Sequence, residues 1–296
     1  MNIKSLKKNL TGWTFVIISL VLVGLFSVYP IISSLILSTM SGKGVVYTFN
    51  GLGNIKRLFS DPVFITALKN TFIYFIFQVP IMLTCAIFFA VLLNDKKLKF
   101  RGFFRTAIFL PCVTSLVAYS ILFKSMFGAD GLVNTILTSI HIINTPIAWL
   151  SDPFWAKVTV IIAITWRWTG YNMIFYLAGL QNIDPSIYEA AEIDGASKFR
   201  QFKAITIPML KPIVLFTSIM STIGTLQLFD EVVNLTSGGA STSSLSATLT
   251  LSQYIYDLSF KYVPNFGYAA TVSYVIVIII AVLSIIQFKV AGDDNV

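Results

Sequence analysis

Residues 189–212 read EAAEIDGASKFRQFKAITIPMLKP, a charged, helix-forming stretch that lies between long apolar segments. Asp184 can cap a helix that starts at the next residue, and Gly195 can end that helix. Ser197 offers a second N-cap, after which the helical run is predicted to continue to Pro208. The pattern therefore predicts a short helix, a tight corner and a second helix. Its mixed charge alone would also suit an ordinary solvated loop.

The composition indicates an integral membrane protein. The chain has 296 residues, of which 56% are hydrophobic and only 11% charged, with a mean hydropathy of +0.80. Soluble domains carry roughly a quarter charged residues. The net charge of +8 needs no nucleic acid to explain it, because cytoplasmic loops of membrane proteins are enriched in Lys and Arg. Cys85 and Cys112 lie in apolar stretches without metal-ligand spacing and are interpreted as packing residues.

Six apolar stretches are long enough to cross a bilayer, which takes about 20 residues. The first carries no charge between Lys8 and Lys43 and is too long for a cleavable signal peptide, so a retained helix is predicted. The fold class is accordingly an all-α integral membrane protein. The predicted spans are Trp13–Leu37, Phe64–Asn94, Phe103–Phe127, Phe154–Gln181, Ile213–Val233 and Gly267–Phe288.

Basic residues predict the orientation. With six crossings both termini lie on one side, and 13 of the 21 Lys and Arg residues fall on that side, against 6 on the other. The richer side is cytoplasmic, so both termini and the stretch 189–212 are predicted to face the cytoplasm. The predicted divisions are a cytoplasmic segment 1–12, a transmembrane domain 13–290 with its loop at 183–212, and a cytoplasmic tail 291–296.

The sequence lacks the motifs of an energy-coupling enzyme. It has no phosphate-binding GxxxxGK[ST] loop, no HExxH or Cys/His cluster for a metal, and no recognisable nucleophile motif. The chain is therefore predicted not to be an enzyme and to bind no cofactor. If it moves a substrate uphill, the ATPase, with its ATP and Mg²⁺, must be a separate partner chain. The alternative to a transport chain with a separate ATPase is a stand-alone ion-coupled carrier. Such carriers usually have carboxylates within the membrane. Here the carboxylates lie outside the spans or at their ends.

Candidate substrate residues cluster in TWRWTGYNMIFY, residues 165–176. Arg167 is an ionisable group within a span, which is a functional-site hypothesis by default. Trp168 and Tyr171 could stack on a sugar ring, and Gly170 would let a ligand approach the backbone. Trp and Tyr at a membrane interface are also ordinary belt residues, and the sequence leaves both interpretations open.

Two further polar runs are candidates. Near the end of the fifth span Gln227 and Asp230 follow a stripe of Ser and Thr, which indicates either contacts between helices or a substrate path. In the third span Thr114 and Ser115 follow Pro111, where backbone groups freed by the proline could line a cavity.

Several of these segments resemble one family. GLGNIKRLFSDPVFITALKNT, RGFFRTAIFLPCVTS, GYNMIFYLAGLQNIDPSIYEAAEIDGAS and LFDEVVNLTSGG are similar to carbohydrate permeases of binding-protein-dependent ABC importers. The similarity covers nearly the whole chain from Trp13 and is greatest to the maltose and glycerol-3-phosphate type, in the half represented by MalF and UgpA. The large extracytoplasmic insertion and the extra leading helices of the maltose permease are absent.

The resemblance implies a type I ABC-importer (MetI-like) fold of six helices in the bacterial inner membrane. It also implies a set of partners: a second, homologous permease, two copies of a cytoplasmic ABC ATPase, and an extracytoplasmic binding protein that delivers a sugar or oligosaccharide. An exporter or a channel is disfavoured, because such proteins rarely carry a loop like 183–212, which resembles the EAA loop of this family. No nucleic acid is expected.

The resemblance also assigns roles to residues. In the family the EAA loop seats on the ATPase, and the matching coupling residues here are Glu189, Ala190, Ala191, Asp194, Gly195, Ala196 and Pro208. Sugar contacts of the maltose-type permease correspond to Trp168, Gly170, Tyr171, Gln227 with nearby Asp230, and the run Thr114–Ser115. Gln227 replaces an asparagine, and Arg167 has no counterpart, so an acidic sugar and a partner helix both remain open for it.

Overall fold

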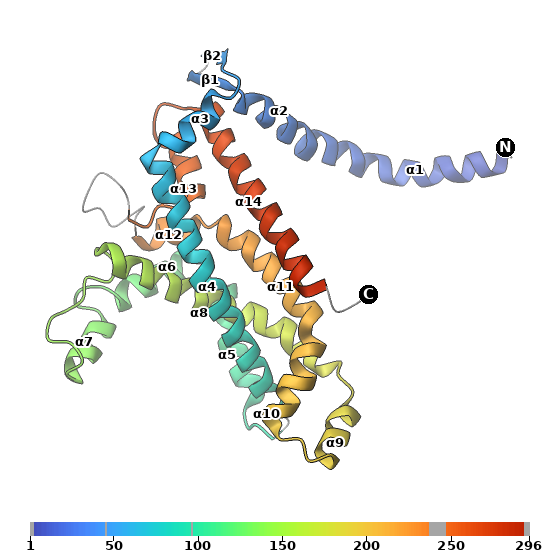
Figure 1. Ribbon diagram of the computed structural model, residues 1–296, viewed down its shortest axis with the longest axis vertical. Helices are drawn as coiled ribbons and strands as arrows, with labels where there is room; N and C mark the ends of the chain where they lie inside the picture. Colours follow the sequence, from blue (N-terminus) through green and yellow to red (C-terminus); the bar gives the residue numbers. More distant parts are fainter. Residues whose placement is uncertain (1–2, 45, 96, 237–246, 293–296) are drawn as a thin grey trace. The chain divides into compact units, whose positions relative to one another are not determined.

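The computed structural model describes residues 3–44, 46–95, 97–236 and 247–292. The chain divides into two compact units, one of Met1–Asp61 with Ile255–Val275 and the other of Pro62–Tyr254 with Ile276–Val296. Both are built almost entirely of helices (Figure 1). The described part includes a single two-stranded sheet, in which β1 (Met40–Lys43) pairs antiparallel with β2 (Val46–Phe49).

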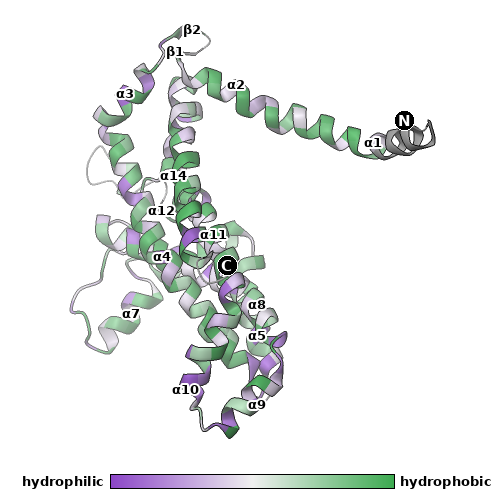
Figure 2. Cartoon of the chain, turned by 45° about the vertical axis from the view of Figure 1, so that its right-hand side comes forward, coloured by the Kyte–Doolittle hydropathy of each residue, from purple (hydrophilic) through white to green (hydrophobic). Residues whose placement is uncertain are grey.

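The first unit starts with a long helical segment and the small sheet. Its helices are α1 (Ile3–Val23), the π-helical turn η1 (Gly24–Val28), α2 (Tyr29–Ser38) and α3 (Gly53–Ser60). The start of α14 (Phe266–Gly292) packs along α2, where the Tyr274 hydroxyl donates to the Ile31 carbonyl at 2.6 Å. Much of α2 has the green of hydrophobic residues in Figure 2, and Ile31 and Ile32 are exposed. Such outward apolar surface suits contact with lipid.

The second unit holds the remaining helices. They are α4 (Pro62–Asn94), α5 (Arg101–Val113), α6 (Leu116–Met126), α7 (Leu132–Ser139), α8 (Pro153–Gln181), α9 (Pro185–Ile193), α10 (Lys198–Gln201), the π-helical turn η2 (Phe202–Thr206), α11 (Ile207–Leu226) and α12 (Asp230–Thr236). Two elements, α13 (Leu251–Tyr256) and α14, are divided between the units, and the π-helical turn η3 (Asp257–Lys261) follows α13.

The core of the second unit lies between α4 and α8, which run side by side (Figure 1). Small and apolar side chains meet there, among them Ala86 of α4 with Met173 and Leu177 of α8. Ala86 is fully buried, and small residues of this kind let membrane helices approach closely. One face of each helix is therefore fixed by packing, which determines the direction of its polar residues.

Within the described part of the chain, four helical segments are long and apolar enough to cross a membrane: Trp13–Ser38, Pro62–Asn94, Lys198–Leu226 and Phe266–Ala291. They contain four of the predicted spans in whole or in large part. The predicted fourth span is the continuous helix α8, which is less apolar because of its Thr, Trp and Asn residues and is not one of the four. The number of six crossings stays a prediction.

The predicted third span is not one helix. Within it α5 ends at Val113 and α6 begins at Leu116, and the two helices differ in direction by 102°. Thr114 and Ser115 have extended backbone, with ψ of 150° and 136°. Pro111 weakens the last turn of α5, because proline has no N–H for the helical ladder. The break follows two residues later.

Two predicted helix ends are also wrong. The helical run after Ser197 does not stop at Pro208 but continues to Leu226, because the wider π-helical turn η2 precedes the proline and makes room for its ring. At the other end the predicted span Ile213–Val233 is interrupted between Leu226 and Asp230, so the chain turns there. Residues 3–12 belong to α1, and of the predicted tail 291–296 the last four residues lie outside the described part.

Candidate functional site

The charged corner at α9 and α10 forms as the sequence predicts. Asp184 caps α9, its Oδ1 accepting from the backbone N–H of Ser186 at 2.9 Å. Hydrogen bonding from Ser186 lowers the pKa of the Asp184 carboxyl. Gly195 takes the left-handed conformation, with φ of +75°, and ends the helix. The Ser197 hydroxyl then caps α10 by accepting from the N–H of Arg200.

Side chains hold the corner closed. Lys198 of α10 forms an ion pair with Glu192 of α9, and this hydrogen bond and the lysine charge hold the pKa of the Glu192 carboxyl below its usual range. The Gln201 amide donates to the Ala196 carbonyl at 3.1 Å. Tyr188 and Thr206 share a hydrogen bond of 3.0 Å between their hydroxyls. The corner is therefore a defined structure and not an ordinary loop.

The outer surface of the corner is open to solvent. Glu189, Ala190, Asp194, Gly195 and Pro208 are exposed, and Ala191 and Ala196 are half-buried. Two large apolar side chains are exposed beside them: Ile193 at 88% and Phe199 at 75%. Sequence reasoning missed both of these, although exposed apolar residues among charges are typical of a surface that a partner covers.

A cavity of about 340 Å³ lies between α4, α8, α11 and α12. Its size is within the range of small-molecule sites. Its lining combines aromatic, amide and carboxylate side chains with apolar ones and comprises Gln78, Met82, Ile164, Trp168, Tyr171, Asn172, Met220, Ser221, Gly224, Thr225, Gln227, Leu228, Phe229, Asp230 and Glu231.

Aromatic rings form one wall of the cavity. The rings of Trp168 and Tyr171, on neighbouring turns of α8, meet edge to face with centroids 5.8 Å apart. Phe229, in the turn after α11, lines the cavity as well. Aromatic faces bind the C–H face of a sugar while their polar edges remain available for hydrogen bonds.

Two buried amides form the polar part of the cavity. Gln78 accepts from the Thr225 hydroxyl at 2.8 Å, and its amide N–H group is directed to the sulfur of Met82 at 3.1 Å. The amide of Asn172 donates to the carbonyl of Trp168 at 3.0 Å and lies 3.6 Å from the same sulfur. A thioether is a weak acceptor, so a ligand hydroxyl can compete well for these N–H donors.

Carboxylates complete the cavity at the start of α12. Glu231 is buried and accepts from the indole N–H of Trp168 at 3.4 Å, whereas Asp230 is exposed. The first turn of a helix favours negative charge. Sequence reasoning selected Asp230 as a substrate residue but not its neighbour Glu231, and it did not select Gln78 or Asn172 although both are polar groups within spans. The i, i+4 spacing of Trp168 and Asn172 is a signal that could have found the asparagine.

The structure brings together four of the predicted substrate residues. Trp168, Tyr171, Gln227 and Asp230 all line the cavity. The other four, Arg167, Gly170, Thr114 and Ser115, are not among its lining residues. Thr114 donates to the carbonyl of Pro111 at 2.7 Å, and Ser115 is exposed at the start of α6.

Arg167 lies beside the cavity wall and not in the wall itself. Its guanidinium is 5.1 Å from the centroid of the Tyr119 ring and 5.7 Å from that of Trp168, which suits cation–π attraction. Its Nε and Nη1 atoms are buried without a hydrogen-bond partner among the described residues. Gly170 has a packing role instead: a Cβ there would overlap the carbonyl of Ile108, so α5 and α8 touch through backbone.

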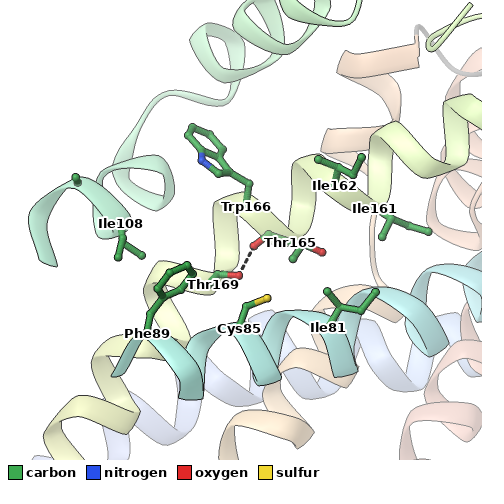
Figure 3. A pocket seen from close by; sticks show the side chains of 10 residues that line it. Ile81, Cys85, Phe89, Ile108, Ile161, Ile162, Thr165, Trp166 and Thr169 are labelled. Atoms are coloured by element: carbon green, nitrogen blue, oxygen red, sulfur yellow. Dashed lines mark hydrogen bonds between the residues drawn. The ribbon is translucent and has the colours of Figure 1, made fainter. Parts of the chain in front are cut away.

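A second cavity, of about 510 Å³, lies between α4, α5 and α8 (Figure 3). Its walls are apolar, with Ile81, Ile162 and Trp166 among them. Apart from the indole N–H of Trp166 and the thiol of Cys85, its polar lining groups are two threonines, and the Thr169 hydroxyl already donates to the carbonyl of Thr165 at 2.6 Å. The cavity therefore offers little to a polar ligand. Within the described residues no cluster of His, Cys, Asp or Glu could hold a metal ion.

Comparison with known proteins adds a family match. Residues 64–290 match the family model described as "Binding-protein-dependent transport system inner membrane component". The chain is 61% identical, over 98% of its length and 97% of the relative's, to the lactose transport system permease protein LacF of Rhizobium radiobacter. It is 35% identical, over 90% of its length and 84% of the relative's, to the arabinooligosaccharides transport system permease protein AraP of Bacillus subtilis.

Solved structures share the fold. A chain of a bacterial ABC transporter involved in the import of the acidic polysaccharide alginate matches with a TM-score of 0.86 and 21% identity, over 99% of both chains. A chain of the alginate transporter in complex with its pentasaccharide-bound periplasmic protein matches with a TM-score of 0.79 and 22% identity, over 97% of this chain and 94% of that one. At these identities the likeness is one of fold.

Proposed function

The chain belongs to the family of binding-protein-dependent transport system inner membrane components, and we propose that it is the permease subunit of an ATP-driven importer of a sugar or oligosaccharide. It is a multi-pass membrane protein of sugar-permease type, like the relatives that it matches over nearly their whole length. The 61% identity to a lactose permease favours a disaccharide such as lactose as the substrate.

The observation that carries the proposal is the composition of the cavity between α4, α8, α11 and α12. It pairs an aromatic wall, Trp168 and Tyr171, with the amides of Gln78 and Asn172, whose N–H donors are directed to the weakly accepting sulfur of Met82. A sugar presents an apolar C–H face and a rim of hydroxyls. The cavity can stack on the first and donate to the second.

The corner of α9 and α10 is proposed to couple the permease to a separate ATPase. Its exposed face combines Glu189 with the apolar side chains of Ile193 and Phe199, and a partner that covers these would move with the corner. Coupling means that ATP binding on the partner shifts the equilibrium between outward-open and inward-open permease. We propose two ATPase copies, which carry ATP and Mg²⁺, and a second, homologous permease.

The extracytoplasmic binding protein is proposed to release the sugar to the permease on the outer side. Both termini and the corner would then lie in the cytoplasm, in agreement with the distribution of Lys and Arg. Chemistry on the sugar is not part of this proposal.

A stand-alone ion-coupled carrier is the less favoured function. Membership of the family of binding-protein-dependent transport components argues against a stand-alone carrier. The buried carboxylate of Glu231, which lines the cavity, is a feature that an ion-coupled carrier would also use. Such a carrier would transport sugar in a membrane that contains neither ATP nor an ATPase, which makes the two functions experimentally distinct.

The test is uptake of labelled sugars by proteoliposomes that contain this chain, its co-expressed partners and the binding protein. Lactose, arabino-oligosaccharides and alginate oligosaccharides would be compared with and without ATP. Glu189→Ala is expected to abolish uptake and to weaken retention of the ATPase during purification. Ser186→Ala, on the same helix, is the control and is expected to transport normally. Uptake without ATP, at the full rate, would refute the importer function.

A further inference from the structure

Glu231 is the most buried charged residue of the cavity lining, with 8% of its surface exposed. Its Oε1 atom accepts from the indole of Trp168 at 3.4 Å, which fixes the carboxylate beside the aromatic wall. The residues described give its other oxygen, Oε2, no hydrogen bond. An ionised carboxylate has several acceptor positions and no donor. Glu231 therefore has unused acceptor capacity at the surface of the cavity.

The charged residues of the cavity lining are both of one sign. Its charged lining residues are Asp230 and Glu231, both acidic. The nearest candidate for a compensating cation is Arg167, which lies beyond the lining and faces the rings of Tyr119 and Trp168. Electrostatic interactions are stronger in a site with low-dielectric walls than in water. A ligand in this cavity thus lies against two acidic side chains and against no basic one among the lining residues.

We propose that Glu231 determines the charge specificity of the permease: it accepts hydrogen bonds from hydroxyls of a neutral sugar and excludes sugars that carry a carboxylate. This inference rests on the proposed function, because it concerns the same cavity. Neighbouring sugar hydroxyls can donate to Oε2 while the amides of Gln78 and Asn172 donate to sugar oxygens. A uronic acid would place a second negative charge beside a buried one, and like charges repel strongly in a site with low-dielectric walls.

The experiment compares two probes that differ in a single group. One is lactose, and the other is lactose in which C6 of the terminal galactose is oxidised to a carboxylate. Binding of each labelled probe is measured at pH 7 to the purified complex of permease and ATPase without the binding protein, so that the binding protein's own selectivity does not contribute. The wild-type complex is expected to bind lactose at least about tenfold more tightly than the acid.

Glu231→Gln removes the charge but keeps the shape and an oxygen for the Trp168 indole. We expect the preference to fall to within about twofold, with tighter binding of the acid accounting for most of the change. Asp130→Asn is the matched control, because this carboxylate is exposed between α6 and α7 and is not among the lining residues, so the preference should stay as in the wild type. Co-purification of the ATPase and the elution volume of each variant report on folding.

The outcomes separate this inference from the proposed function. Equal or tighter binding of the acid to the wild type would refute charge selection by Glu231, and so would a preference that Glu231→Gln leaves unchanged. ATP-dependent uptake of lactose in the same preparation would keep the proposed function intact in both cases. A complex that neither binds nor transports any of the sugars would refute both.

Discussion

The carbonyl of Ile108 lies directly against Gly170, so that α5 and α8 pack with no side chain between their backbones. Gly170→Ala is therefore expected to destabilise the second unit by about 1–3 kcal/mol, the usual cost of overpacking, and to lower the melting temperature of the detergent-purified complex. Gly102→Ala in α5 is the control, since a Cβ there meets nothing within 4 Å. An unchanged melting temperature together with lost sugar binding would instead assign Gly170 to the substrate site.

Gly195 should be replaceable by asparagine but not by valine. Its φ of +75° is in the left-handed region, which costs an ordinary L-residue about 1–2 kcal/mol and is tolerated best by glycine and asparagine. Gly195→Val is expected to distort the corner and reduce ATP-dependent uptake several-fold, whereas Gly195→Asn keeps most of it. The measurement is uptake per assembled complex. Equal activity of the two variants would show that the shape of the corner is not needed for coupling.

Arg167→Met is expected to leave the affinity for lactose within about twofold of the wild type. The guanidinium is outside the cavity lining. Its buried N–H donors have no hydrogen-bond partner among the described residues, so its removal is expected to cost little stability. Tyr119→Leu, which removes the ring under the guanidinium, is a useful companion. Direct binding to the purified complex measures the effect. A large loss of affinity in an assembled Arg167→Met complex would restore Arg167 to the substrate site.

The hydrogen bond between Thr225 and Gln78 should couple α11 to α4. Thr225→Val leaves the Gln78 Oε1 atom buried without its donor, which typically costs about 1–3 kcal/mol. A double-mutant cycle with Gln78→Leu, read from denaturation of the complex, should return a coupling energy of about 0.5–3 kcal/mol. Additive effects of the two substitutions would show that the bond contributes nothing to stability.

Low pH should loosen the corner of α9 and α10. The pKa of Glu192 is depressed by Lys198, so the stabilisation from this pair is complete above the ordinary glutamate pKa of about 4.3 and is lost as the pH falls through the lower folded-state value. Hydrogen exchange of residues 189–201 in the complex, compared with Glu192→Gln at each pH, measures this. Wild type and variant should differ near pH 6 and converge in acid. A constant difference across the range would contradict the prediction.

Local features of the corner could be predicted from the sequence. Asp184, Gly195 and Ser197 act through hydrogen bonds and backbone angles within a few residues of themselves, so their effects do not depend on the rest of the fold. The membrane class follows equally directly from the apolar composition, and the resemblance to sugar permeases agrees with the family match.

Tertiary packing decided the rest. Which side of α8 faces the cavity depends on where α4 and α5 pack, so sequence alone could not separate Trp168, which lines it, from Arg167, which does not. The turn at Gln227 ends α11 and carries Glu231 into the same cavity, whereas a continuous helix would have directed that carboxylate elsewhere. Hydropathy reports the depth of a residue in a membrane, but its direction is fixed by the helices that pack against it.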